Sequence, residues 1–153
     1  MAEIMKGVMY IMPEKEEKVL RIIVCRPDEY AEVVEIEDSL EAMQKTVGGL
    51  IEEYMPWEDE VAIICNEEGK MNGLPLNRGI TDENGHLQDI IAGDFFICYA
   101  PIESERFLSM PPELEEKYLE KFKLPEMFFR TKDGIRAEKY VPRQQESMRD
   151  YAR

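Results

Sequence analysis

The stretch "KVLRIIVCRPDEYAEVVEIE", residues 18–37, decides the fold class of this chain. Residues 18–27 are largely apolar and end at Pro27, which has no backbone N–H with which to continue a ladder of hydrogen bonds. Residues 30–37 alternate apolar and acidic side chains, as a strand with one wet face does. A polar turn around Asp28 and Glu29 joins the two segments, so the stretch predicts a β-hairpin.

An amphipathic helix is predicted directly after this hairpin, over about residues 39–54. Asp38 is a candidate N-cap with Glu41 three residues later, and Pro56 ends the pattern. The apolar residues of one helical face are Leu40, Met43, Val47, Leu50, Ile51 and Tyr54. The pair Gly48-Gly49 lies inside this helix, where each glycine costs roughly 1 kcal/mol relative to alanine. We attribute it to close packing of the helix on a strand, and keep access of a ligand to the backbone as the alternative.

The rest of the chain contains further strands and a second helix. "EVAIIC" (60–65) and "FFICYA" (95–100) are typical of inner strands, and between them the turns "NG" (72–73) and "DENG" (82–85) bracket "LPLNRGI". A helix over about 112–123 begins with proline and has lysines late in it, which suits the helix dipole. Residues 135–142 indicate an edge strand after the turn "TKDG".

This order of elements predicts an α+β fold with a mixed or antiparallel sheet, one packed amphipathic helix (about 39–54) and a C-terminal helical extension (about 112–123). We expect an α+β core domain over residues 18–103. Residues 1–17 form an N-terminal extension, and residues 104–153 a helical and basic C-terminal extension packed on the core.

Charge is distributed unevenly along the 153 residues. The net charge is -14, with 9 basic and 27 acidic residues before position 117 and 10 basic and 6 acidic from there on. The core should repel phosphates, so we expect no direct nucleic acid binding by it, whereas a basic protein partner is compatible with it. No apolar run has the roughly 20 residues of a membrane helix and no signal peptide is recognisable, so we expect a cytoplasmic protein without a membrane partner.

The three cysteines each close a short apolar run, at Cys25, Cys65 and Cys98. An odd number is a poor disulfide framework, and a zinc site would want paired CxxC spacing or a nearby histidine. We therefore expect small buried thiols and no metal. The polar loop around His86 also lacks the glycine position and the closing glutamate of a calcium loop.

No catalytic motif is present. The GxSxG, P-loop, GxGxxG and HExxH patterns are all absent, and carboxylate pairs are uninformative in so acidic a chain. We therefore lean against an enzyme, and expect no catalytic residue and no cofactor.

Arg78 is the best candidate for a binding residue. Between Thr46 and Glu105 only Lys70 and Arg78 are basic, against 13 acidic residues. A guanidinium suits carboxylate or phosphate, and the amide of Asn77 adds a donor and an acceptor. In a cleft these two residues could hold a small anionic ligand, with the candidate stacking residues Tyr54, Trp57 and Phe95.

The alternative role of Arg78 is structural. Buried arginines are usually paired, and Asp89 and Asp94 follow in the next turn-bounded segment. In that case Arg78 forms a salt bridge with one of them, and no anion site exists.

Residues 21–100 resemble the domain-of-unknown-function family DUF3846 of Firmicutes, their phages and conjugative elements. The resemblance is carried by "SLEAMQKTVGGLIEEY", "VAIICNEEGKMNGLPLNR" and "DIIAGDFFIC", and continues more weakly into "LEEKYLEKFKLPEMFF". The family has no established activity. The resemblance implies a mobile-element setting, in which small acidic proteins often act by binding.

Two function classes remain. The first is a non-enzymatic binding module that captures a small anionic ligand or a partner near the LPLNR segment. The second is an acidic DNA mimic or inhibitor that blocks a basic surface through carboxylates, namely Glu52, Glu53, Glu58, Asp59 and Glu60. A homodimer is an open alternative in either class.

Overall fold

The computed structural model describes residues 2–5, 8–11 and 19–143. A five-stranded sheet has the order β4-β3-β9-β6-β5, in which every neighbouring pair is antiparallel. Its strands are β3 (Val19–Cys25), β4 (Glu32–Glu37), β5 (Ile51–Tyr54), β6 (Val61–Asn66) and β9 (Phe95–Tyr99). The α+β class and the predicted hairpin of β3 and β4 are thus confirmed.

Two helices and three hairpins complete the described chain. The helices are α1 (Leu40–Val47) and α2 (Pro112–Phe122). The hairpins are β1 (Ala2–Met5) with β2 (Val8–Ile11), β7 (Leu76–Thr81) with β8 (Leu87–Ala92), and β10 (Glu126–Thr131) with β11 (Gly134–Lys139). Within the described ranges, no helix has the length and hydropathy that crossing a membrane requires.

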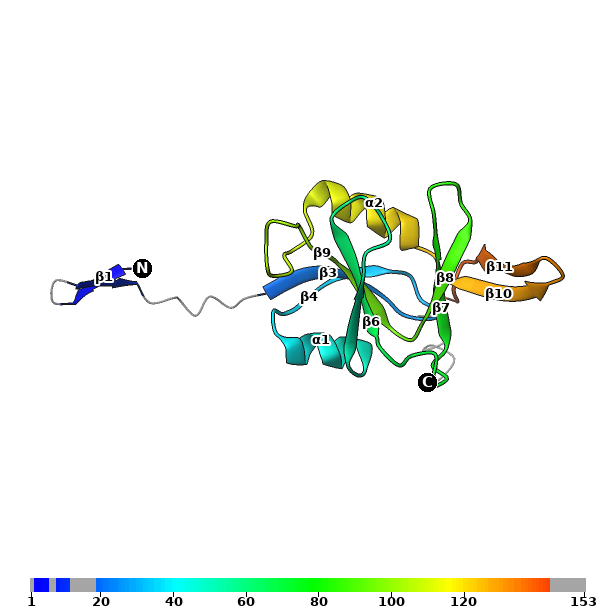
Figure 1. Cartoon of the computed structure of the whole chain (residues 1–153), viewed down its shortest axis with the longest axis horizontal. Helices are drawn as coiled ribbons and strands as arrows, with labels where there is room; N and C mark the ends of the chain where they lie inside the picture. The colour runs from blue at the N-terminus through cyan, green and yellow to red at the C-terminus, as the bar shows by residue number, and fades with distance from the viewer. Residues whose placement is uncertain (1, 6–7, 12–18, 144–153) are drawn as a thin grey trace.

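The sheet is covered on both faces (Figure 1). Because side chains alternate along a strand, even-numbered residues of β3, β6 and β9 face α1, and odd-numbered ones face α2 and the β7–β8 hairpin. The α1 side contains Leu20, Ile22, Val24, Met43, Val47, Ala62, Ile64, Phe96 and Cys98. The α2 side contains Ile23, Cys25, Val61, Ile63, Ile80, Ile91, Phe95, Ile97, Tyr118 and Phe122. Helix α2 therefore packs in the same core as the central strands.

The first helix is shorter than predicted. It ends at Val47 because Gly48 adopts a left-handed backbone (φ 82°) and donates its N–H to the Gln44 carbonyl at 2.7 Å. Residues 51–54, expected in the helix, instead form β5 at one edge of the sheet. The helix is present, but its predicted end near residue 54 was wrong because the glycine at 48 is a C-cap, a position where glycine carries no cost.

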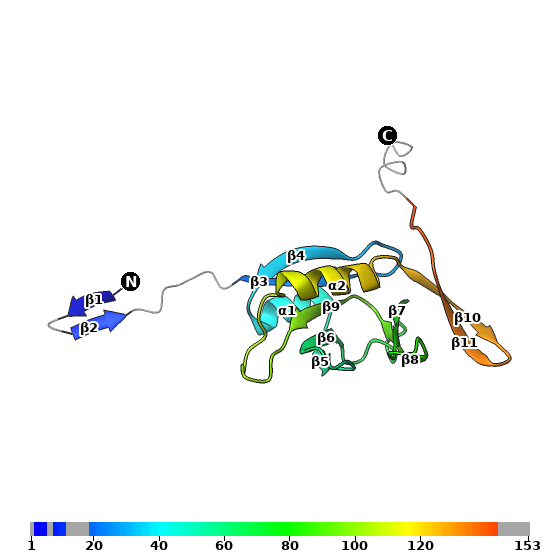
Figure 2. The same ribbon diagram turned by 90° about the horizontal axis from the view of Figure 1, so that it is seen from above.

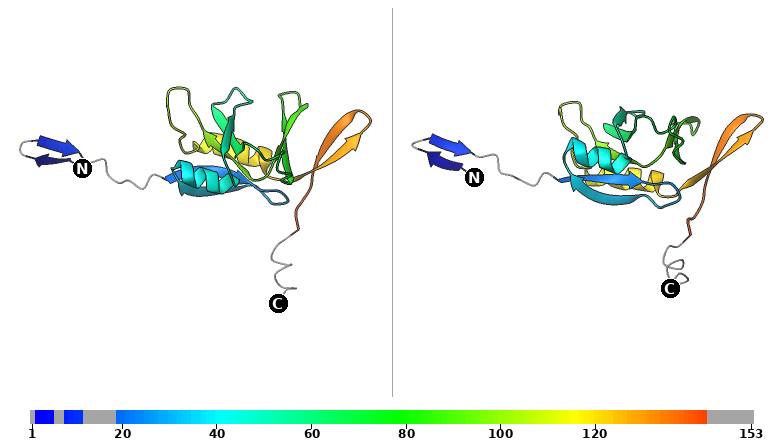
Figure 3. Two further views of the ribbon diagram at one scale, coloured as in Figure 1. Left: turned by 60° about the horizontal axis from the view of Figure 1, so that its bottom comes forward. Right: turned by 90° about the horizontal axis from the view of Figure 1, so that it is seen from below.

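The C-terminal part contains more strand than expected. Helix α2 begins and ends close to the predicted 112–123. The strand β11 corresponds to the edge strand predicted over 135–142, but its partner strand at residues 126–131 was not predicted. We call the β10–β11 hairpin, residues 126–139, the arm. Figures 2 and 3 show it extending beyond the sheet and the two helices.

Candidate functional site: the LPLNR segment and the groove beside it

Arg78 lies inside the molecule, on β7. Its side chain is 1% exposed, and each of its five N–H groups has an acceptor. Nε and Nη2 donate to the Phe122 carbonyl at 3.1 and 3.0 Å, and Nη2 also donates to the Glu29 carbonyl at 2.8 Å. Nη1 donates to the Arg26 carbonyl at 3.1 Å and to Asn77 Oδ1 at 2.8 Å. The guanidinium is thus fully used by acceptors within the chain.

Asn77 continues the same network. It is also 1% exposed, and its Nδ2 donates to the carbonyls of Cys25 and Gly93 at 2.9 and 2.8 Å. Its Oδ1 accepts an N–H from Arg78 Nη1, so both the nitrogen and the oxygen of the amide have hydrogen-bond partners. Together the two side chains join β7 to the β3–β4 turn, to the start of β9 and to the end of α2.

The structure contains neither of the two arrangements considered from the sequence. Arg78 does not face solvent, and within residues 19–143 Asp89 pairs with Lys70 at 2.6 Å. Asp94 has its pKa raised by burial, an effect opposed by the charge of Arg26. Burial lowers the pKa of Arg78 itself, and nearby anionic groups such as Glu126 act in the opposite direction. The sequence suggested a carboxylate partner, whereas the partners are three backbone carbonyls and the Asn77 side-chain oxygen. Every residue type has a backbone carbonyl, so the sequence does not reveal which ones accept.

Gly79 links this network to the arm. Its N–H donates to Glu126 Oε1 at 2.6 Å. A Cβ at position 79 would lie 2.5 Å from Leu87 Cδ1 and 3.3 Å from the same Glu126 oxygen. Glycine therefore permits the first residue of the arm to approach β7 closely.

The three aromatic candidates do not surround Arg78 as a stacking pocket. Phe95 is fully buried and meets the Phe122 ring edge-on, with centroids 6.0 Å apart. Trp57 contacts the rings of Tyr118 and Phe122 and donates its indole N–H to the Thr81 carbonyl at 3.3 Å. Tyr54 is half-buried against the same core. All three therefore support packing between α2, the sheet and the β7–β8 hairpin.

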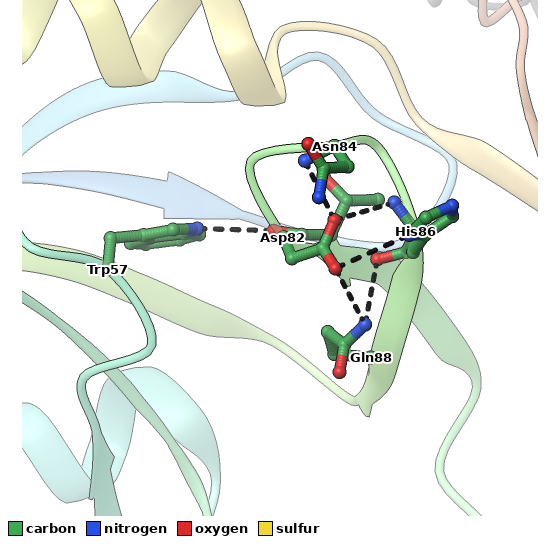
Figure 4. A network of polar contacts seen from close by, with 6 residues as sticks. Trp57, Asp82, Asn84, His86 and Gln88 are labelled. Atoms are coloured by element: carbon green, nitrogen blue, oxygen red, sulfur yellow. Dashed lines mark hydrogen bonds and ion pairs between the residues drawn. The ribbon is translucent and has the colours of Figure 1, made fainter.

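The turn between β7 and β8 is closed by Asp82 (Figure 4). Its Oδ1 accepts the backbone N–H groups of Asn84 and His86 at 2.9 and 2.8 Å, and Oδ2 accepts Gln88 Nε2 at 3.2 Å. These bonds hold the pKa of Asp82 below its ordinary value, the His86 backbone contact contributing most. Because the carboxylate is already bonded to this loop, the loop functions as a turn.

A groove lies beside the LPLNR segment, between the β7–β8 hairpin and the arm. Its volume is about 1190 Å³. From β7 and β8 it is lined by Leu76, Thr81 and Leu87, and from the arm by Ile135 and Ala137. Leu76 is 47% exposed and Ile135 50% exposed, so apolar surface on both sides is open to solvent. We call this feature the groove.

Charged side chains line the rest of the groove in both signs. Lys70, Arg136 and Lys139 stand against Asp89, Glu126 and Asp133. A surface with apolar side chains and both signs of charge suits a polypeptide segment better than a small anion. Sequence reasoning missed the groove because β10 was not predicted. Its signal was the apolar, aromatic run "MFF" before the turn at 132–133 and the alternating "GIRAEK" after it.

Two of the five carboxylates proposed for an acidic interface have partners inside the molecule. Asp59 accepts Lys117 Nζ at 2.6 Å and the Tyr118 hydroxyl at 2.8 Å. Glu60 accepts the N–H of Ile102. Glu52, Glu53 and Glu58 are exposed at or near the β5 edge.

The three cysteines are free and buried, as expected. Burial raises the pKa of Cys25 to about 12 and that of Cys65 to about 11. Cys98 lies on the opposite face of the sheet from these two, and burial raises its thiol pKa as well. In the part of the chain that the structure describes, no group of histidine, cysteine and carboxylate side chains is arranged to hold a metal ion.

Comparison with known proteins places these features in a family. No match is found among curated proteins or among solved structures. The model of one family, described as a domain of unknown function (DUF3846), matches residues 20–123. The match includes the LPLNR segment and ends one residue after Phe122, whose carbonyl accepts Arg78. The chain therefore belongs to the DUF3846 family.

Proposed function

We propose that this chain is a non-enzymatic binding module of a bacterial or mobile-element protein, and that it holds a segment of a partner protein in the groove beside LPLNR. The observation that carries the proposal is the groove itself. A volume of about 1190 Å³ is bordered by exposed Leu76 on one hairpin and exposed Ile135 on the other. Open apolar surface of this kind, with charged residues around it, is typical of interaction sites.

A partner segment is favoured over a small anionic ligand. All five N–H groups of Arg78 donate to acceptors of the chain itself, so this residue contributes no donor to a ligand. Asn77 likewise uses both ends of its amide internally. In this proposal the two residues fix the wall of the groove, and the ligand contacts Leu76, Thr81 and Leu87.

The proposed setting is the bacterial cytoplasm, in hosts of mobile elements such as phages and conjugative elements. The resemblance to family members of Firmicutes supports this setting. Three buried free thiols are also compatible with a reducing compartment.

Selection from a library of random peptides displayed on phage tests the proposal. Peptides selected on the wild-type protein should lose binding to Ile135→Asp, because a charge in the apolar part of the groove opposes desolvation. Ile102→Asp is the matched control, since Ile102 is 86% exposed and lies outside the groove. Peptides that bind both variants equally well would contradict the proposal.

The second candidate function is an acidic inhibitor of a basic surface. Exposed Glu52 and Glu53 on the edge strand β5, with Glu58 nearby, favour it. A lysine- and arginine-rich peptide should then bind with an affinity that falls steeply as salt rises. The triple variant Glu52→Gln, Glu53→Gln, Glu58→Gln should abolish this binding, and undiminished binding would exclude the candidate.

A further inference from the structure

The arm has two faces with different surroundings. The face that includes Ile135 and Ala137 lines the groove. The opposite face carries Met127 and Phe129, which are 46% and 39% exposed. Phe129 lies opposite Arg136 in the register, and the Arg136 guanidinium carbon lies 5.8 Å from the centre of the Phe129 ring. We call the surface of Met127, Phe129 and Arg136 the outer face.

The outer face lacks a covering element in the described chain. A two-stranded hairpin is marginally stable in water on its own, and this one exposes a methionine and an aromatic ring where polar side chains would suffice. The arm itself holds four basic and three acidic residues, a net charge of +1, whereas residues 19–122 hold 8 basic and 24 acidic ones.

A hollow of matching character lies where α2 meets the β3–β4 turn. Its volume is about 420 Å³, and its apolar lining comes from Tyr30, Ala31 and Leu119. Tyr30 is 44% exposed. The carboxylates of Glu116 and Glu120 also line it. We call this feature the hollow: an apolar depression with acidic side chains beside it.

We propose that the outer face of the arm docks into the hollow of a second copy of this chain. The Phe129 ring enters beside Tyr30 and Leu119. Arg136, whose ion pair with Glu138 on the arm is exposed, meets the carboxylates of Glu116 and Glu120. Opposite charge and shared apolar character on two surfaces of one chain make them complementary to each other.

The position of the hollow makes the docking reciprocal. Lys123 lies at the hollow, and only three residues later Glu126 begins the arm, so both surfaces lie at the same end of the molecule. A two-fold axis there seats both arms at once and closes the assembly as a dimer. A nucleic acid is a less favourable occupant of the arm, because residues 19–122 carry a net charge of -16 that repels phosphates but does not repel an arm with a net charge of +1. The proposed contact uses the face of the arm opposite the groove, and of the outer-face residues named above only Arg136 also borders the groove.

Sedimentation equilibrium of the full chain tests the proposal. At about 100 µM, where an interface of micromolar affinity is mostly occupied, the wild type should have twice the mass of the chain. Phe129→Asp and Tyr30→Glu should each weaken association by at least about tenfold, because each places a carboxylate in the desolvated contact. Ile102→Asp and the groove variant Ile135→Asp should both remain dimeric, and circular dichroism checks that each variant is folded.

Mixing the two weakened variants gives the decisive result. The arm of Tyr30→Glu and the hollow of Phe129→Asp are both intact, so the mixture should associate more tightly than either variant alone. A wild type that stays monomeric overturns the proposal, and so does a dimer that Tyr30→Glu leaves unchanged. If the wild type is monomeric and binds duplex DNA through the arm, a nucleic acid replaces the second copy as the proposed partner of the arm.

Discussion

Arg78 and Asn77 resemble a ligand-binding pair in the sequence, but in the structure both are buried and bonded to the chain itself. A buried guanidinium is costly unless every N–H is satisfied, and here the acceptors come from Arg26, Glu29, Phe122 and Asn77. No side-chain carboxylate is needed, because backbone carbonyls at the end of α2 and in the β3–β4 turn are themselves in need of donors. The presence of this arginine in the acidic stretch is therefore explained by its hydrogen bonds, which join β7 to the β3–β4 turn and to the end of α2.

Removing this guanidinium should cost much of the stability of the domain. Arg78→Gln leaves buried carbonyls without donors, and we expect the free energy of unfolding to fall by roughly 3–5 kcal/mol. Urea denaturation measures the change. Arg106→Gln is the matched control, since Arg106 makes an exposed ion pair with Asp38 and should cost less than about 1 kcal/mol. Equal losses in both variants would contradict the assignment of Arg78 as a junction.

The cysteines give a second prediction about single residues. Burial raises the pKa of Cys25 to about 12 and of Cys65 to about 11, so at pH 8 almost no thiolate is present at either. A thiol reagent such as Ellman's reagent should modify none of the three cysteines in the native protein and all three in denaturant. Rapid modification of the native protein at any of them would be inconsistent with this burial.

At the scale of elements, the sequence predicted the helices and strands whose position depends on a local pattern of residues. The β3–β4 hairpin and α2 follow from alternation, Pro27 and the prolines at the start of the helix. The length of α1 was missed because the apolar spacing continues past Val47 while Gly48 ends the helix. The groove and the carbonyl partners of Arg78 depend on contacts between segments far apart in sequence, such as Arg78 with Phe122, which local patterns do not contain.

The end of α1 can be tested by the sign of one substitution. If residue 48 were inside a helix, Gly48→Ala would stabilise the protein by roughly 1 kcal/mol. At a left-handed C-cap with φ 82°, the same change should destabilise it by roughly 1 kcal/mol. No atom lies within 4 Å of the added Cβ, so the effect reports backbone conformation alone. Thermal denaturation gives the sign, and a stabilised variant would rule out the cap.

The hydrogen bond between Glu126 and β7 is one of the contacts that attach the arm, and Lys139 also donates to the Lys121 carbonyl at 3.3 Å. Glu126→Ala removes the acceptor of the Gly79 N–H, and hydrogen exchange at Gly79 and along the arm should accelerate by at least about tenfold. The central strands β3, β6 and β9 should keep their protection. Glu138→Ala, which breaks an exposed ion pair with Arg136 on the same arm, serves as the control and should change little. Unchanged exchange in Glu126→Ala would show that other contacts hold the arm.

At the scale of the whole molecule, charge divides the chain into a strongly acidic body and a C-terminal part, residues 123–143, with six basic and three acidic residues. Residues 19–122 carry a net charge of -16, and the family match ends at residue 123, directly before the arm. The part matched by the family model is thus the sheet with its two helices and the β7–β8 hairpin, and the arm lies beyond the match. We propose that this added element, together with β7 and β8, decides what the domain binds.

Self-repulsion of the acidic body gives a prediction about ionic strength. Raising the salt concentration from about 0.01 M to about 0.1 M shortens the Debye length from about 30 to about 10 Å and screens repulsion between distant carboxylates. The melting temperature should rise by about 2–4 °C for each 1 kcal/mol by which the free energy of unfolding increases. Calorimetry at the two salt concentrations checks this, and a lower melting temperature in salt would mean that ion pairs such as Arg21–Glu115 outweigh the repulsion.

The most direct test of the internal role of LPLNR is hydrogen exchange at the arginine Nε–H groups of the wild-type protein, followed by NMR in D₂O. The Arg78 Nε–H donates to a buried carbonyl, whereas Arg136 is 63% exposed. We predict that the Arg78 signal persists after the Arg136 signal has disappeared, and that inorganic phosphate does not shift it. Exchange at Arg78 as fast as at Arg136, or a shift on addition of phosphate, would contradict the internal junction and restore an anion site.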